Sequence, residues 1–170
     1  MKTVTRALVV RSVDYKDSDK ILTLLTPDMG KLSAGARGCR KKGSAIAAAC
    51  QLLCWSELVL SDRGGKWSVS EASTLREFLG VRRDLDKLAL ACYFAEMAEV
   101  LSVEGMPSPG LLSLTLNSLH ALECLDRPPE QIKAVCELKA MCLAGYEPLI
   151  AGCALCGEEN PEQAWFHLRE

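Results

Sequence analysis

Residues 3–37 read TVTRALVVRSVDYKDSDKILTLLTPDMGKLSAGAR, and this stretch decides the predicted fold. Thr3–Val13 and Asp19–Thr26 are rich in β-branched and aliphatic residues, which is typical of β-strands. The polar segment 14–18 between them predicts a turn. Pro27–Gly30 (PDMG) predicts a second tight turn, because its glycine accepts a positive φ. The chain is therefore predicted to open with strands joined by short turns.

A third strand is predicted at Lys31–Arg37, where apolar and polar positions alternate. Its even-numbered positions are apolar, whereas its odd-numbered positions carry two cations with small residues between them. Gln51–Leu60 and Lys66–Glu71 predict a further hairpin across the segment 61–65. Five short strands within about 70 residues are too few for two covered sheets, and they predict a closed barrel of the OB type.

The second half of the chain has the periodicity of helices. Thr74–Glu77 fits a capping box, in which the threonine hydroxyl and the glutamate carboxylate bind each other's free amides. Asp84 is predicted to cap a long helix that ends at about Leu101. The fold class is therefore α+β, with an amino-terminal five-stranded OB-fold barrel followed by a helical domain.

Two more helices are predicted from proline and leucine spacing. Ser108-Pro109 indicates a cap followed by a first-turn proline, and Pro129 opens the last helix, which Gly145 and Pro148 end. The residues predicted to face the core from these helices are Leu112, Leu116, Leu119 and Leu122, then Ile132, Val135, Leu138 and Cys142.

The 170 residues are 49% hydrophobic, which is enough to form a real core. We expect an OB-fold DNA-binding domain at 1–73 and a helical domain at 74–148. Residues 149–170 are expected to begin a cysteine-containing, zinc-ribbon-like segment that is incomplete in this chain. The boundary near residue 73 is a change of period without a flexible linker, so the two domains are expected to pack together.

Charge is distributed unevenly along the chain. Residues 1–45 carry ten lysines and arginines against four aspartates, whereas residues 71–170 carry eight against sixteen acidic residues. Such asymmetry indicates a basic module for a polyanion joined to an acidic module that would repel one. Lysine and arginine neutralise phosphates and release counterions, which gives sequence-independent, salt-sensitive affinity for nucleic acid.

The predicted DNA-binding residues are the cations of the early strands and of the loop 38–43. They are Arg6, Arg11, Lys20, Lys31, Arg37, Arg40, Lys41 and Lys42. Tyr15, Trp55 and Trp67 are the only aromatic residues of the predicted barrel. This scarcity favours tracking of the phosphate backbone over stacking on bases.

Catalytic and metal-binding patterns are scarce. Cys153 and Cys156 form a C-x-x-C-G knuckle, which is half of a tetrahedral zinc site, and chance spacing among nine cysteines explains it equally well. His167 is the only later ligand, and His120 is interpreted as an ordinary helix residue. The acidic turn 14–19 lacks the glycine and terminal glutamate of an EF-hand loop. We therefore expect that the protein is not an enzyme. No cofactor is certain, and zinc is the one candidate cofactor.

No targeting signal or membrane span is predicted. Arg6 and Arg11 interrupt the amino-terminal apolar residues, and no apolar run approaches the roughly 20 residues that cross a bilayer. We expect a cytoplasmic, nucleoid-associated protein without a membrane partner.

Several of these segments resemble the RecO family of bacterial recombination mediators. The resemblance runs through the whole chain in order and is most specific in the opening strand-turn-strand block. Asp17 stands where the family often has glutamate, and Arg37 where it commonly has lysine. The matching segments are Ala7–Tyr15, Asp17–Pro27, Gly30–Ser33, Ala36–Gly38 and Gly145–Leu149, followed by Cys153 and Cys156.

The resemblance implies an OB barrel and a helical domain in a protein of DNA repair. It implies a mediator that helps to load the RecA recombinase onto single-stranded DNA coated by single-strand-binding protein, and that anneals complementary strands. Single- and double-stranded DNA, a RecR-type protein and single-strand-binding protein are the implied partners. Members with a zinc site complete it with a second cysteine pair downstream, so this chain resembles a member without its last third.

Two alternatives from other classes remain open. One is a protein–protein scaffold whose OB barrel binds no nucleic acid, and which would show no response to single-stranded DNA at low salt. The other is a metal-dependent enzyme that uses the acidic turn or the cysteine pair. It would show a metal-stimulated nuclease or hydrolase activity that depends on Asp17 or Cys153.

Overall fold

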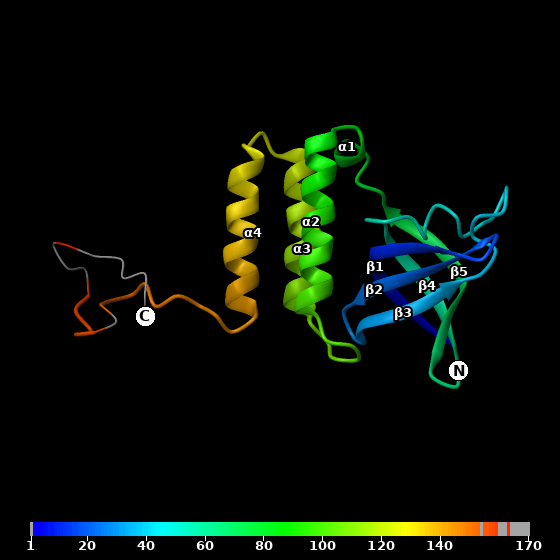
Figure 1. Cartoon of the computed structure of the whole chain (residues 1–170), viewed down its shortest axis with the longest axis horizontal. Helices are drawn as coiled ribbons and strands as arrows, with labels where there is room; N and C mark the ends of the chain where they lie inside the picture. Colours follow the sequence, from blue (N-terminus) through cyan, green and yellow to red (C-terminus); the bar gives the residue numbers. More distant parts are fainter. Residues whose placement is uncertain (1, 154, 160–162, 164–170) are drawn as a thin grey trace.

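The amino-terminal part of the molecule is a closed five-stranded barrel. The computed structural model describes residues 2–153, 155–159 and 163. The strands follow the order β1-β2-β3-β5-β4 around the barrel, which closes where β3 and β5 pair in parallel (Figure 1). This arrangement confirms the predicted OB-type barrel. The strands are β1 (Lys2–Tyr15), β2 (Asp19–Thr26), β3 (Gly30–Ala36), β4 (Trp55–Arg63) and β5 (Lys66–Arg76).

The run Ala7–Val10 in β1 is buried on both of its faces. Ala7 and Val9 belong to the apolar cluster inside the barrel. Leu8 and Val10 belong to a second cluster, which the barrel shares with the helices. A strand covered on both sides has no polar face, which explains why the sequence is continuously apolar here and does not alternate. In β3, by contrast, the predicted alternation is confirmed, with the even-numbered positions buried.

Strand β4 begins at Trp55, so the prediction of a strand from Gln51 was wrong. Residues 39–54 form a series of turns in which Cys39 and Cys50 pack against the barrel core. Leu53 still donates its N–H to the Val9 carbonyl, but it has a φ of 63°, which no regular strand residue adopts. Burial raises the pKa of the Cys50 thiol to about 12, as expected for a cysteine that serves as a small hydrophobic residue.

The predicted capping box at Thr74–Glu77 was also wrong. Thr74 and Arg76 pair with β4, opposite Ser56 and Trp55, because strand pairing satisfies their backbone groups before a helix begins. The helices are α1 (Leu79–Arg82), α2 (Leu85–Leu101), α3 (Pro109–Cys124) and α4 (Pro129–Leu143).

The predicted helix starts are confirmed for the three long helices. Asp84 caps α2, because its Oδ1 accepts the N–H groups of Asp86 at 3.0 Å and Lys87 at 3.1 Å. Pro109 and Pro129 are the first residues of α3 and α4. None of the helices among the described residues has the length and apolarity to cross a membrane.

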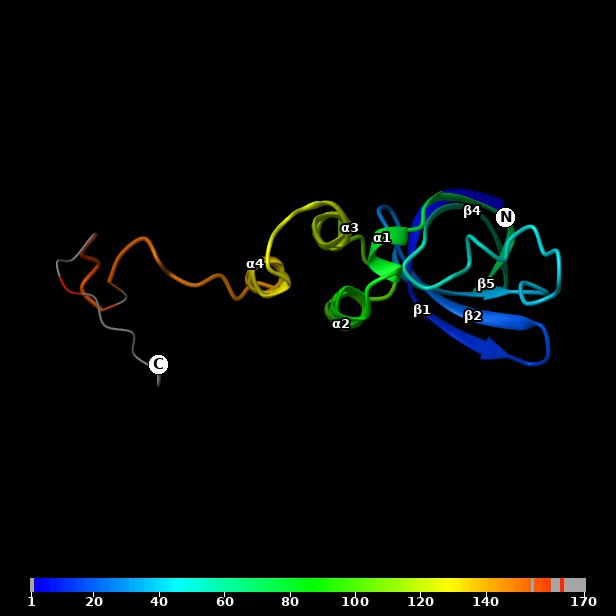
Figure 2. The ribbon, with the colours of Figure 1, turned by 90° about the horizontal axis from the view of Figure 1, so that it is seen from above.

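The buried face of α4 differs from the predicted one. Cys136 and Ala140 are the buried residues of the helix, whereas Val135 and Leu138 are each 53% exposed. In the view of Figure 2, α4 lies on the far side of α2 and α3 from the barrel. The helix thus packs mainly through its small residues, with Ile132 half-buried against the same core cluster as predicted, whereas Val135 and Leu138 remain outside the contact.

A partly buried contact fixes the end of β5 to α1 and α3. Arg76, the last residue of β5, donates from Nη2 to Glu123 Oε2 at 2.7 Å, and the Gly80 N–H donates to Oε1 at 3.0 Å. A Cβ on Gly80 would lie 2.9 Å from the Glu123 Cγ, so the backbone approaches this side chain closely. Burial alone would raise the pKa of Glu123, but the bonds from Arg76 and Gly80 lower it below the ordinary value.

Replacing Glu123 with glutamine is expected to destabilise the fold in a pH-dependent way. The lowered pKa means that Glu123 stabilises the folded chain above its unfolded pKa of about 4.3, and that this contribution is lost as the pH falls through the lower folded value. Because the Arg76 side chain is 41% exposed, we expect a loss of only about 1 kcal/mol at pH 7. Urea unfolding at pH 7 and pH 4 measures the loss in the free energy of unfolding. Glu96→Gln, at an exposed position of α2, is the control. Equal losses in both variants would contradict the assignment.

Replacing Gly30 with alanine is expected to cost more than replacing Gly64. Both glycines have a φ of 64°, so both substitutions carry the same backbone strain, about 1 kcal/mol. A Cβ on Gly30 would lie 2.0 Å from the Met106 carbonyl oxygen, whereas a Cβ on Gly64 meets nothing within 4 Å. We expect roughly twice the loss or more for Gly30→Ala, measured by thermal unfolding. Similar losses would show that the approach to Met106 relaxes freely.

Candidate nucleic-acid interface

Six cations lie around one end of the barrel. The β1–β2 turn and the segment after β3 meet there, because Lys20 pairs with Ala36 and the Arg40 N–H donates to the Ser18 carbonyl at 3.0 Å. Five of the six side chains are exposed, and Lys20 is half-buried. We call this group the basic rim, and its members are Lys16, Lys20, Arg37, Arg40, Lys41 and Lys42.

Asp19 holds the two segments of the basic rim together. Its Oδ1 accepts the Gly38 N–H at 2.8 Å and the Ser18 hydroxyl at 3.3 Å. The hydrogen bond from Gly38 is the main cause that lowers the pKa of Asp19, and the nearby charges of Lys16 and Arg37 lower it further. The lowered pKa favours the ionised carboxylate, and the positive charges of Lys16 and Arg37 lie near it.

The loop after β3 needs a glycine at its second position. Gly38 has a φ of 65°, and the Lys41 Cδ lies 3.6 Å from the place that a Cβ on Gly38 would take. The Lys41 side chain therefore folds back over the turn. Arg40 forms an ion pair with Asp14 at 3.2 Å and donates to the Lys16 carbonyl at 3.4 Å. Within the described ranges, the other five members of the basic rim form no ion pair with a carboxylate.

Three of the eight predicted binding residues lie elsewhere. The Lys31 Nζ donates to the Glu99 carbonyl at 2.7 Å, and the Arg11 Nη1 lies 3.4 Å from the Glu99 Oε1. Both cations thus bind the carboxyl-terminal part of α2 and fasten the helix to the barrel. Arg6 is exposed on the β1–β4 side, 3.9 Å from a Glu57 carboxylate oxygen. Sequence reasoning missed Lys16, whose place in the turn just before Lys20 was the available signal.

The basic rim lies away from the acidic half of the chain. In Figure 1 the β1–β2 turn and the first part of the loop after β3, residues 37–43, lie on the side of the barrel opposite the helices, whereas the end of that loop returns to them. Most of the acidic residues follow residue 71 and belong to the helical part or to the segment after it. The attraction of the rim for a polyanion is therefore weakened little by the acidic module.

Cys153 and Cys156 lie on a single tight turn. The Gly157 N–H donates to the Cys153 carbonyl at 2.8 Å, which closes a tight turn. The N–H groups of Cys156 and Leu155 lower the pKa of the Cys153 thiol, which favours the thiolate that a metal binds. Among the described residues, no third ligand lies near this pair. His167 lies outside the described residues.

A second group of ligand atoms lies on α3. His120, Glu123 and Cys124 hold ligand atoms within 4.8 Å of one another. The Arg76 Nη2 already contacts all three, at 2.9 Å from the His120 Nδ1, 2.7 Å from Glu123 and 3.7 Å from the Cys124 Sγ. The cluster therefore holds a guanidinium group. The spacing of three and four residues on one helix was the sequence signal for it.

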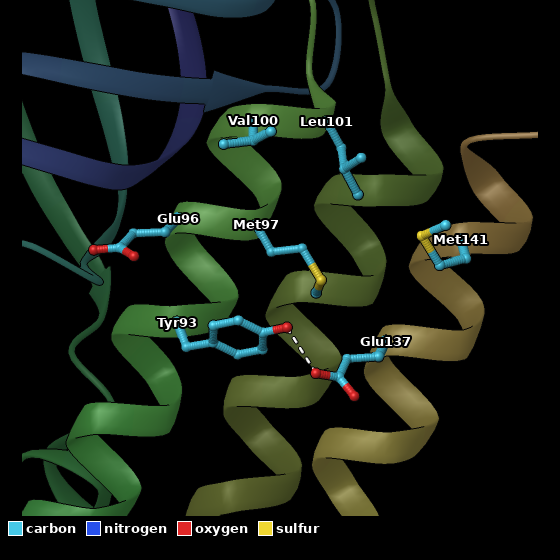
Figure 3. Close-up of a pocket in the computed structure, with 7 residues that line it drawn as sticks. All are labelled: Tyr93, Glu96, Met97, Val100, Leu101, Glu137 and Met141. Atoms are coloured by element: carbon cyan, nitrogen blue, oxygen red, sulfur yellow. Dashed lines mark hydrogen bonds between the residues drawn. The ribbon is translucent and has the colours of Figure 1, made fainter.

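An apolar groove of about 510 Å³ lies between α2 and α4 (Figure 3). The hydroxyl of Tyr93 donates to the Glu137 Oε1 at 2.7 Å across one end, and this bond raises the pKa of the tyrosine. Met97 and Met141 line the wall. The residues that line the groove include no serine, cysteine or histidine.

Comparison with known proteins agrees with this architecture. A family model described as "Recombination protein O N terminal" matches residues 1–78, which include the barrel. A second, described as "Recombination protein O C terminal", matches residues 82–170.

Curated relatives carry the same name. The chain is 33% identical over 162 residues to "DNA repair protein RecO" of Acetivibrio thermocellus, covering 95% of this chain and 64% of the relative. It is 36% identical over 152 residues to the protein of that name from Desulfitobacterium hafniense, covering 89% and 55%. For Symbiobacterium thermophilum the identity is 34% over 156 residues, covering 92% and 62%. The chain thus spans between half and two thirds of the length of these relatives. The two family matches, which together cover nearly the whole chain, and the identity to these relatives show that the chain belongs to the RecO family.

Proposed function

We propose that this chain binds DNA through the basic rim and serves in recombinational DNA repair without catalysing a reaction. The observation that carries the proposal is the gathering of six cations on the side of the barrel opposite the helices. Asp19 and Gly38 hold the two segments that carry these cations in place. A surface of this kind fits the phosphates of a nucleic acid backbone.

The proposed binding step is the neutralisation of phosphates. Exposed ammonium and guanidinium groups displace the counterions condensed on DNA, and the release of those counterions favours the complex. Lys41 and Lys42 act as point charges, whereas Arg37 offers a planar fork for two phosphate oxygens. No step in this binding reads a base edge in a groove, so the rim by itself gives affinity with little sequence preference.

The acidic helical part is proposed to face protein partners. Its charge would repel DNA, and the groove between α2 and α4 presents an apolar wall to solvent. Membership of the RecO family supports a mediator role that loads the RecA recombinase onto single-stranded DNA coated by single-strand-binding protein. The same membership supports strand annealing and a RecR-type partner as further proposals.

Zinc is proposed as a ligand of the cysteine knuckle. Cys153 and Cys156 would supply two thiolates, and the remaining ligands would have to come from outside the described residues. When bound, the metal would hold the knuckle as a structural site.

Removing cations from the basic rim is expected to lower both the affinity for DNA and its dependence on salt. In Arg37→Ala/Lys41→Ala/Lys42→Ala, three phosphate contacts are lost, so the slope of log affinity against log salt for a single strand should fall by about 2. Fluorescence anisotropy of a labelled oligonucleotide over a salt series measures the slope.

Arg6→Ala provides the matched control, since Arg6 is exposed on another side of the same barrel. Its slope should equal that of the unsubstituted chain, and thermal unfolding should show both variants folded. A triple variant with an unchanged slope would refute the basic rim as the interface. Absence of salt-dependent binding in the unsubstituted chain would instead favour a scaffold that binds no nucleic acid.

A further inference from the structure

Three side chains that can bind a metal gather on one face of α3, beside the end of β5. His120, Glu123 and Cys124 are three and four residues apart, so the helix brings them to the same face. One ligand atom from each residue, a nitrogen, an oxygen and a sulfur, lies within 4.8 Å of the other two. His120 and Cys124 are exposed and Glu123 is half-buried, so solvent reaches the group. We call these three residues the α3 ligand cluster.

All three ligand atoms contact the same nitrogen of Arg76. Its Nη2 lies 2.9 Å from the His120 Nδ1, 2.7 Å from the Glu123 Oε2 and 3.7 Å from the Cys124 Sγ. A guanidinium nitrogen only donates hydrogen bonds, so the Nδ1 of His120 that contacts it is the unprotonated, accepting nitrogen. Imidazole binds metals through a nitrogen in this form. The cluster therefore already surrounds one positive charge with the atoms that a metal ion needs.

The guanidinium of Arg76 does not satisfy the cluster fully. Its Nη2 carries two hydrogens and cannot serve three acceptors with well-directed bonds, and its contact with Cys124 is the longest of the three. The Arg76 Cζ also lies 4.9 Å from the centre of the Phe78 ring, and the side chain is 41% exposed. The guanidinium can therefore leave the cluster and keep favourable contacts with this ring and with water.

The backbone of α1 orients the Glu123 carboxylate. The Gly80 N–H donates to the Glu123 Oε1 at 3.0 Å, which leaves Oε2 free to face the other two ligand atoms. Carboxylates that bind metals commonly accept such an outer hydrogen bond, because it fixes their orientation. Glu123 therefore presents one oxygen to the cluster whichever cation the cluster holds.

The mixture of donor atoms selects the class of metal. Mg²⁺ and Ca²⁺ prefer oxygen ligands, whereas a set that includes thiolate and imidazole favours Zn²⁺. Zinc bonds of about 2.0–2.3 Å in a tetrahedron place the ligand atoms roughly 3.5 Å apart. Since the ligand atoms lie within 4.8 Å of one another, the side chains need to close in by roughly 1 Å. Small side-chain rotations at these exposed positions allow that movement.

We propose that the α3 ligand cluster binds Zn²⁺ in place of the Arg76 guanidinium. On binding, the Cys124 thiol releases its proton to solvent, and its sulfur, the Glu123 Oε2 and the His120 Nδ1 each form a bond to the ion, with water as the fourth ligand. The charges of the thiolate and the carboxylate balance the charge of the ion. This site is distinct from the cysteine knuckle, and it does not depend on the proposed binding of DNA.

Zinc binding at this cluster loosens the joint between β5 and the helices. All three ligands belong to α3, so the ion does not replace the contact that Arg76 makes from the end of β5. The Gly80 contact with Glu123 remains. The cluster thus links the presence of a metal to the way in which the barrel is held.

The first test uses Co²⁺ as a spectroscopic probe of the zinc site. It is made on the full chain with Cys153→Ser/Cys156→Ser, which removes the thiolates of the knuckle. We expect equimolar Co²⁺ to produce the near-ultraviolet charge-transfer band of a thiolate–cobalt bond, and we expect Zn²⁺ but not Mg²⁺ to abolish the band. Absence of the band would overturn the inference.

The second test removes the ligands one at a time in the same background. Cys124→Ser should abolish the band, and His120→Ala should weaken the affinity for Co²⁺ by about tenfold or more. Cys142→Ser is the matched control, because Cys142 is a half-buried cysteine on α4 outside the cluster. A band that persists in Cys124→Ser would place the ion elsewhere and refute the site.

The third test removes the competing cation. Arg76→Gln should bind Co²⁺ about five- to tenfold more tightly, because the ion no longer displaces a charged hydrogen-bond partner. Arg83→Gln removes the same charge from an exposed position at the end of α1, and should change the affinity less than about twofold. An affinity that does not rise in Arg76→Gln would contradict the exchange. Circular dichroism establishes that each variant is folded, and the ligand variants test the site with Arg76 intact.

Discussion

The double burial of β1 is the constraint on which the rest of the structure depends. Ala7 and Val9 fill the barrel, and Leu8 and Val10 of the same run pack against the helices. One strand thus belongs to two cores, and the helical part cannot shift along the barrel without exposing apolar surface of that strand to water. This fixes which part of the barrel wall is covered and which part stays open.

The same constraint divides the cations of the barrel into two groups. The cations on the part of the barrel that α2 covers are Arg11 and Lys31, and both bind Glu99. Those at the far end have no helix beside them, and among the described carboxylates only Asp14 forms an ion pair there. A cation's role is therefore set by its distance from α2 more than by the strand that carries it.

Two carboxylates organise the two ends of the barrel in a similar way. Asp19 ties the β1–β2 turn to the loop after β3 through Gly38, and Glu123 ties the end of β5 to α1 through Arg76 and Gly80. Each accepts a backbone N–H and lies beside a cation, and each consequently has a lowered pKa. The contacts of Asp19 hold the loops that carry the basic rim, and the contacts of Glu123 hold the barrel against the helices.

The sequence by itself determined the barrel class and the starts of the long helices. Strand alternation in β3, the cap at Asp84 and the first-turn prolines at 109 and 129 are local devices whose effect depends on neighbours within a few residues. The gathering of cations near residues 37–42 was also predictable, because they lie close together in the chain.

Only the tertiary structure decided which of several local possibilities was used. Thr74 carries a good capping signal, yet β4 is available as a pairing partner and satisfies its backbone first. In α4 the buried face goes through Cys136 and Ala140, because close packing on a neighbouring helix selects small residues over larger apolar ones. Likewise, the place of Glu99 beside Lys31 depends on a contact between residues 68 positions apart. Periodicity shows that a face is apolar, but only packing decides which partner covers it.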